Sequence, residues 1–296
     1  MSKYFPYIFW SMLAVAFVLS FMVADEIENR LTSIEKNLDV IESALEEKYT
    51  YEIIFIDDGS TDKTKDYVTT HFPDIRYMRT PYEDGYCKAF NKALPFIDTP
   101  YILCIDPSIS LSGLTLSEFL VKAQAKQAFM LAFPLYHNHQ KYNSHHLILN
   151  GLTCSLHPST SGSSSCFISE LMLLDTKRVQ AFGGLSTHYF HPAFSWCDLI
   201  MRAQCQGQLI EHIDLGTSKK MALSGSLFSY HLSASTLFKD NFLFQWRHCC
   251  SFASRLRRFL YTLYLCLCFK PRKLGYVIHA FIRWAFFSKS YRYHWS

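Results

Sequence analysis

Between residues 52 and 133, short runs of β-forming residues alternate with runs that suit a helix. The expected strands are residues 52–56, 75–78, 101–105 and 129–133, and the expected helices between them are residues 61–71, 86–94 and 116–126. Strand–helix alternation with short connections is typical of βαβ units on a mostly parallel sheet. The sequence therefore predicts an α/β fold with a Rossmann-like, mostly parallel sheet and helices on both of its faces.

Acidic residues stand directly after two of the expected strands. Asp57 and Asp58 follow the strand at 52–56, and Asp106 follows the strand at 101–105. In open parallel sheets, ligands bind beyond the carboxyl ends of the strands. We therefore expect these three acids to share one edge of the sheet and to form part of a binding site there.

Six segments, in chain order, resemble motifs of family 2 glycosyltransferases. The first is residues 51–64, whose Asp57-Asp58-Gly59-Ser60 turn closely resembles the turn after the second strand of that family. The others resemble the G-x-x-x-A-x-N helix start, the D-x-D metal strand, the G-G-F-D-E segment, the E-D-x-D-L-x-x-R helix and the H-x-x-G-S element, and they are residues 84–93, 101–108, 181–186, 195–202 and 231–235. The resemblance covers residues 25–240.

This resemblance implies a GT-A fold that binds a nucleotide-diphosphate sugar with Mg²⁺ or Mn²⁺ and passes the sugar to a glycan or lipid-linked acceptor. A divalent cation neutralises the departing pyrophosphate as a Lewis acid, and hard cations prefer oxygen ligands. By the resemblance, Asp57 and Asp58 would contact the donor nucleotide, and Gly85 would let the backbone approach it closely. Asp106 would be the carboxylate on the metal side, with His231 as a further contact to the metal or the pyrophosphate.

Two departures from the family motifs bear on activity. Ser108 stands where the metal motif has its second acid, which removes a charged ligand. In the E-D-x-D motif, Ser195 and Trp196 replace the first two acids, and the usual base aligns with Trp196, which cannot accept a proton. Either Asp198 serves as a displaced base that takes the proton of the acceptor hydroxyl, or the chain is a catalytically inactive, membrane-tethered GT-A module that binds a nucleotide-sugar or a partner enzyme.

Residues 5–24 contain no charged side chain. At about 1.5 Å per residue, a helix of this length would cross the hydrocarbon core of a bilayer. Three interpretations remain open: a membrane anchor, a cleaved signal peptide and, over residues 14–21, a buried first strand of the following domain. Periodicity alone does not separate a short buried strand from part of an apolar helix. Residues 25–48 then place apolar side chains at steps of four and three, which predicts an amphipathic helix.

The net charge of +4 hides a strong asymmetry along the chain. All 25 acidic residues lie at or before Asp240, so residues 1–240 carry −6 and residues 241–296 carry +10. The basic tail is also rich in aromatic and apolar residues, which favours a segment lying in an anionic membrane interface. A basic helix packed on the domain is one alternative. A nucleic-acid-binding segment is the other, and we expect no nucleic acid partner because the apolar runs would be unexplained on DNA or RNA.

We expect the chain to be divided into three segments: an anchor or first strand at 1–24, a GT-A glycosyltransferase-like domain at 25–240, and a basic aromatic membrane-interface tail at 241–296. The serine-rich residues 155–165 have the composition of a loop. A disordered chain is excluded because 49% of the residues are apolar. We expect the protein at a membrane, with its catalytic domain facing the cytoplasm.

Overall fold

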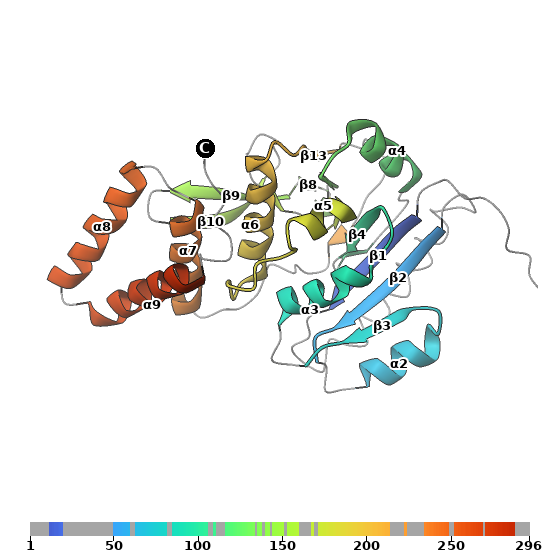
Figure 1. Cartoon of the computed structure of the whole chain (residues 1–296), viewed down its shortest axis with the longest axis horizontal. Coiled ribbons are helices and arrows are strands. Elements are labelled where there is room, and N and C mark those ends of the chain that lie inside the picture. The colour runs from blue at the N-terminus through green and yellow to red at the C-terminus, as the bar shows by residue number, and fades with distance from the viewer. Residues whose placement is uncertain are drawn as a thin grey trace, which may run out of the picture.

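The computed structural model contains a seven-stranded sheet, which lies toward the end of the molecule opposite α7, α8 and α9 (Figure 1). Its strand order is β13-β6-β12-β4-β1-β2-β3. The strands are β1 (Met12–Leu19), β2 (Thr50–Asp57), β3 (Arg76–Arg79), β4 (Tyr101–Ile105), β6 (Met130–Ala132), β12 (Leu171–Asp175) and β13 (Ile210–His212). Strand β12 runs antiparallel to its neighbours β4 and β6, whereas the other neighbours pair in parallel. The predicted α/β class with a mostly parallel sheet is therefore confirmed.

The helices follow the strands along the chain. They are α2 (Thr64–His71), α3 (Tyr86–Ala93), the short 3-10 helix η3 (Leu94–Phe96), α4 (Leu116–Lys126), α5 (Thr176–Ala181), α6 (Pro192–Cys205), α7 (Ala234–His248), α8 (Phe252–Leu267) and α9 (Pro271–Phe287). The structure describes residues 12–19, 50–59, 63–81, 85–105, 109–110, 116–133, 135–137, 140–142, 144–150, 153–159, 167–168, 171–213, 222–223, 234–248, 252–268 and 270–287. The amphipathic helix predicted at 25–48 lies outside these residues.

Strand β1 occupies a central position in the sheet, between β2 and β4. Met12 pairs with Thr50 of β2, and Leu13 pairs with Tyr101 of β4, both in parallel register. Of residues 5–24, the structure describes Met12–Leu19, which form a strand as in the third interpretation; residues 5–11 and 20–24 lie outside the described residues. A membrane-spanning helix over Met12–Leu19 is incompatible with this arrangement, because those residues cannot pair with β2 and β4 and also form a helix.

The core lies around the carboxyl half of β2, strand β4 and helices α3 and α6. The side chains of β2 from Ile53 to Asp57 are buried, as expected for a strand with neighbours on both sides and cover on both faces. Helix α6 is buried along most of its length, because it contacts α3 on one side and α7 on another. It therefore links the sheet to the C-terminal helices.

Two smaller sheets accompany the main one. One contains β10 (Thr153–Ser159), β9 (Ser144–Asn150) and β11 (Phe167–Ile168), and the other contains β5 (Ile109–Ser110), β14 (Ala222–Leu223), β7 (Leu135–His137) and β8 (Gln140–Tyr142). The loop predicted at 155–165 is therefore wrong for residues 155–159, which belong to β10. Strand β10 pairs only with β9 among the described strands, and Pro158 is tolerated because an edge strand needs fewer N–H donors.

The C-terminal residues form three helices that pack on one another at one end of the molecule (Figure 1). Helix α7 packs against α9, and α8 packs against α9. The Trp246 ring lies 5.0 Å from that of Phe281 and 5.3 Å from that of Trp284, while the Arg258 guanidinium lies 5.3 Å above Trp246. Within the described part of the chain, no helix combines the length and the apolar character needed to cross a membrane.

Candidate functional site

Two acidic residues end β2, at the carboxyl edge of the sheet where the sequence predicts the donor site. Asp57 is fully buried, accepts a hydrogen bond from the Tyr77 hydroxyl, and lies 3.8 Å from Nε of Arg79. The Thr80 hydroxyl donates to Asp58 at 3.0 Å. All three partners come from β3 or from the residue after it, so the neighbouring strand fixes both carboxylates.

The start of α3 faces open space. Gly85 precedes the helix with φ of +75°, a backbone conformation that favours glycine. A Cβ placed on Gly85 would meet no heavy atom of the described residues within 4 Å. The described residues therefore leave room beside the Gly85 backbone, and the role that the resemblance gives to Gly85 stays a prediction.

Helix α6 contributes two buried side chains next to α3. Trp196, at the position that aligns with the family's base, donates from Nε1 to the Tyr86 hydroxyl at 3.2 Å and meets the Phe90 ring edge-on at 5.3 Å. The Ser195 hydroxyl donates to the Ser186 carbonyl at 2.7 Å. These two replacements for acidic residues are therefore packing and hydrogen-bonding groups.

The electrostatics of Cys87 connect this region to the acidic pair. Burial raises the pKa of the Cys87 thiol to about 12; a hydrogen bond with Ser195 opposes the increase, and the charges of Asp240, Asp58 and Asp198 add to it. The thiol is therefore protonated at neutral pH. Because Asp58 and Asp198 both act on it, the carboxylates after β2 and on α6 lie within electrostatic range of the same atom.

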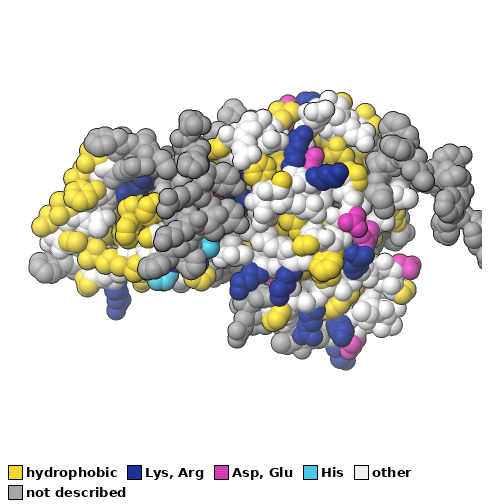
Figure 2. Space-filling view, viewed as in Figure 1, with side chains coloured by type: hydrophobic (Ala, Val, Ile, Leu, Met, Phe, Trp, Pro, Cys, Tyr) yellow, Lys and Arg dark blue, Asp and Glu magenta, His cyan; other side chains and the backbone are white. Residues whose placement is uncertain are grey.

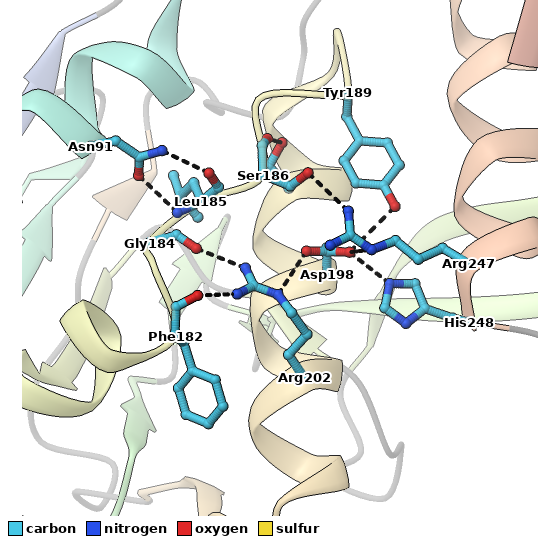
Figure 3. Close-up of polar contacts among 11 residues, drawn as sticks. Asn91, Phe182, Gly184, Leu185, Ser186, Tyr189, Asp198, Arg202, Arg247 and His248 are labelled. Atoms are coloured by element: carbon cyan, nitrogen blue, oxygen red, sulfur yellow. Dashed lines mark hydrogen bonds and ion pairs between the residues drawn. The ribbon is translucent and has the colours of Figure 1, made fainter. Parts of the chain in front are cut away.

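Asp198 is the centre of a buried polar cluster that joins α6 to α7 (Figure 3). Its carboxylate contacts Nε of Arg202 at 2.9 Å, Nε of Arg247 at 3.0 Å and Nε2 of His248 at 2.8 Å. The Tyr189 hydroxyl donates to the same carboxylate at 3.4 Å. Arg202 comes from one turn further along α6, whereas Arg247 and His248 come from the end of α7.

These partners determine the protonation state of Asp198. Burial alone would raise the pKa of this carboxyl, but the hydrogen bond from His248 and the charges of Arg247, His248 and Arg202 outweigh burial and hold the pKa well below its usual range. A carboxylate that is fully buried and so weakly basic is poorly suited to take a proton from an acceptor. The assignment of Asp198 as the base stays a prediction. The contacts of Asp198 favour a different role, in which its carboxylate holds α7 in position against α6.

Side chains of α3 and α6 form hydrogen bonds with the backbone of the segment between α5 and α6 (Figure 3). Arg202 donates to the Phe182 carbonyl and, at 2.7 Å, to the Gly184 carbonyl. The Asn91 side chain donates to the Leu185 carbonyl at 2.7 Å and accepts from the Leu185 N–H at 2.8 Å. The G-x-x-x-A-x-N and D-L-x-x-R motifs contain Asn91 and Arg202, but the sequence does not indicate that both hold this segment.

Asp240, in the middle of α7, forms a second buried polar contact with the residues directly before α6. One carboxylate oxygen accepts the N–H groups of Phe190 at 2.8 Å and His191 at 2.7 Å. The other oxygen, Oδ1, has no hydrogen-bond partner among the described residues. Burial raises the pKa of Asp240 from 3.8 to about 6, although the two N–H donors and the charge of Arg283 counteract part of the increase.

We expect the raised pKa of Asp240 to appear in the pH dependence of stability. The folded state binds this proton more tightly than the unfolded chain, so its stabilising effect is complete below pH 3.8 and is lost as the pH rises through about 6. The loss should amount to about 1–3 kcal/mol of unfolding free energy. Urea unfolding of the wild type and of Asp240→Asn, at pH values below and above 6, measures this loss of unfolding free energy. If both proteins show the same pH dependence of stability, the prediction is wrong.

The sequence assigns Asp106 and His231 to the metal side of the predicted site. Asp106, Ser108 and His231 lie outside the described residues. Within the described ranges, no group of three or more His, Cys, Asp or Glu side chains could hold a metal ion. The described residues therefore do not by themselves form a site for a divalent cation.

Comparisons with known proteins relate the chain to glycosyltransferases. The sequence profile of "Glycosyl transferase family 2" matches residues 20–196. The fold is similar to that of S. aureus TarS 1-349 in complex with UDP-GlcNAc, with a TM-score of 0.53 and 12% identity over 79% of this chain and 65% of that chain. It is also similar to that of GalNAc-T7 with UDP, GalNAc and Mn²⁺, with a TM-score of 0.51 and 11% identity over 78% of this chain and 47% of that chain.

These similarities concern the fold, because the identities are low. The chain spans less than two thirds of the length of either solved structure. Both neighbours are GT-A glycosyltransferases, so the predicted GT-A fold is confirmed. No curated protein sequence matches the chain.

Proposed function

The chain belongs to glycosyl transferase family 2, and on that premise we propose that it transfers a sugar from a nucleotide-diphosphate sugar to a glycan or lipid-linked acceptor. The observation that carries the proposal is the pair of acids at the end of β2. Asp57 is buried and fixed there by Tyr77 and Arg79, at the edge of a parallel sheet where ligands bind. The open start of α3 at Gly85 supports the same site.

The acidic pair would bind the donor through its nucleotide. Carboxylate oxygens accept hydrogen bonds, so Asp57 and Asp58 suit the N–H and hydroxyl groups of a base and a ribose. Both carboxylates are already oriented by side chains from β3 and the residue after it. A preoriented acceptor loses less side-chain entropy on binding than a mobile one.

The proposal includes Mg²⁺ or Mn²⁺ as the cofactor, with Asp106 and His231 as the residues that would hold it. Such a cation would neutralise the pyrophosphate of the leaving nucleotide. Support comes from membership of the family. The solved structure of GalNAc-T7 contains Mn²⁺ together with UDP. Ser108 weakens the site, because a hydroxyl replaces a charged ligand.

A second candidate function is that of a catalytically inactive module that binds a nucleotide-sugar or a partner enzyme. Two observations favour it: Trp196 fills the position of the usual base and is hydrogen-bonded to Tyr86, and the Asp198 carboxylate is paired with two arginines and hydrogen-bonded to His248. A chain of this kind would keep the donor site at Asp57 and lack turnover.

Nucleotide binding tests the donor site directly. We expect Asp57→Asn to raise the Kd for UDP by at least about tenfold, since hydrogen bonds to charged groups contribute about 1.5–3 kcal/mol. Isothermal titration calorimetry with Mn²⁺ present measures the Kd. Asp74→Asn, which changes an exposed acid near β3, is the matched control and should leave the Kd unchanged. Equal Kd values for Asp57→Asn and the wild type would exclude the acidic pair from the site.

Transfer assays separate the two functions. A panel of nucleotide sugars, beginning with the UDP-GlcNAc bound in the TarS structure, is tested with Mn²⁺ and with EDTA. Release of nucleotide that stops in EDTA supports the transferase with its cation. Tight nucleotide binding without release over the whole panel supports the inactive module instead.

A further inference from the structure

Helix α8 presents an apolar stripe on its solvent side. Leu256, Leu260, Leu263 and Leu267 are exposed and are spaced four, three and four residues apart, so they lie on one face of the helix. The exposed fraction reaches 70% at Leu267, and it is 65% at the flanking Phe259. Figure 2 shows apolar side chains gathered over this end of the molecule.

The opposite face of α8 packs on the protein. Arg258 and Leu265 are seven residues apart and buried, and the half-buried Tyr261 and Thr262 lie between them. Arg258 donates to the Gln245 carbonyl of α7 at 3.1 Å. A helix packed on one side normally has polar residues on the other. Helix α8 has leucines there, so its outer face is unusual for contact with water alone.

Helix α9, which contacts α8, and the turn before it add exposed apolar and basic groups to this end of the protein. Ile278 and Ile282, one turn apart on α9, are exposed. Exposed cations lie just before α9 and in its first turn: Lys270, Arg272 and Lys273. Lys270 also lies 5.6 Å above the Tyr264 ring of α8. The surface therefore combines leucine and isoleucine side chains with a cluster of positive charges.

We propose that the outer face of α8 and α9 binds the surface of an anionic lipid bilayer. Apolar stripes next to Lys and Arg suit a helix that lies in the interface, with its apolar side chains among the acyl chains and its cations at the headgroups. Helices of 16 and 17 residues that do not qualify as spans fit this orientation. The absence of any acidic residue after Asp240 leaves no charge to repel an anionic surface.

Charge favours a bilayer over a second copy of the chain as the occupant. Residues 241–296 carry ten Lys and Arg and no Asp or Glu. Two copies joined through this face would bring like charges together, whereas phosphatidylglycerol or phosphatidylserine headgroups complement them. The proposal goes beyond sugar transfer, since neither Asp57 nor Asp198 takes part in it.

Flotation of the full chain with lipid vesicles tests the apolar half of the proposal. Vesicles of phosphatidylcholine and phosphatidylglycerol in equal parts should bind the wild type, and pure phosphatidylcholine vesicles should bind it much more weakly. We expect Leu260→Glu with Leu263→Glu to lower the partition coefficient at least about tenfold. Phe96→Glu with Val121→Glu adds two charges at apolar residues that are 56% and 55% exposed elsewhere, and should leave the partition coefficient unchanged.

The basic half is tested by removing three charges. Lys270→Gln, Arg272→Gln and Lys273→Gln together should remove most of the preference for anionic vesicles, because each cation near the surface adds to the attraction of anionic headgroups. The matched control is Lys63→Gln, Lys65→Gln and Lys177→Gln, which changes three exposed lysines of the GT-A part. Circular dichroism confirms that each variant is folded, which is expected because the changed side chains are exposed.

Three results would overturn the proposal. The first is equal binding of the wild type to neutral and anionic vesicles. The second is undiminished binding of the double glutamate variant. The third is a wild-type dimer without lipid that the double glutamate variant converts to a monomer in light scattering, since a second copy would then cover this face.

Discussion

Replacing Asp198 by alanine is expected to lower the free energy of unfolding by about 3–5 kcal/mol, because removing one partner of a buried ion pair leaves the others uncompensated. In this protein Arg202, Arg247 and His248 would all lose the carboxylate. Urea unfolding followed by circular dichroism measures the change. The control is Asp74→Ala, which removes an exposed acid and should change stability by no more than about 0.5 kcal/mol.

A milder substitution separates positioning from catalysis at the same residue. Asp198→Asn keeps the shape of the side chain and removes its charge. If Asp198 positions α6 against α7, the variant loses stability and any turnover keeps its pH profile. If Asp198 is the base, turnover falls by several orders of magnitude in a folded protein, and the acidic limb of the pH profile disappears. The second result would show that the buried cluster opens during the reaction.

Gly184→Ala is expected to cost about 2–5 kcal/mol of unfolding free energy, combining left-handed backbone strain with overpacking. Gly184 has φ of +70°, and a Cβ there would collide with Oδ1 of Asn91 and lie 3.1 Å from Cδ2 of Leu94. Asn91 cannot move away without losing both of its hydrogen bonds to Leu185. Thermal and urea unfolding measure the loss.

Gly207→Ala isolates the backbone contribution. Gly207 also has φ of +70°, but within the described part of the chain a Cβ on it would meet nothing within 4 Å. The expected cost is therefore only the strain of about 1–2 kcal/mol. If both glycine variants lose the same stability, the collision of the Cβ added at Gly184 with Asn91 contributes nothing to the loss. Asn91 would then not hold the segment before α6 rigidly.

Local patterns predicted much of the α/β fold. Strand β4 and helix α4 occupy the residues expected for them, 101–105 and 116–126, because apolar residues and turn signals define both ends. Residues 155–159 were predicted as a loop and form β10 instead. Their serines and Pro158 are poor strand formers, and pairing with β9 overrides that local preference.

The site was predictable where its residues are close in sequence. The positions of Asp57 and Asp58 at the end of β2 and of Gly85 before α3 follow from strand ends and turn residues. The partners Arg247 and His248 of Asp198 were not predictable, because about fifty residues separate them from it and no pattern marks them. A cluster of this kind arises from the packing of α7 on α6, which a single sequence does not reveal.

The position of β1 also imposes an order on folding during synthesis. Met12 can pair with Thr50 only after β2 has been synthesised and has emerged from the ribosome. Leu13 can pair with Tyr101 only after β4 has emerged as well. Parallel pairings across such separations form slowly, because a long loop must close before any contact compensates for its entropy. An apolar segment that is made early must therefore stay unpaired until late, and during that interval it is an exposed target for chaperones.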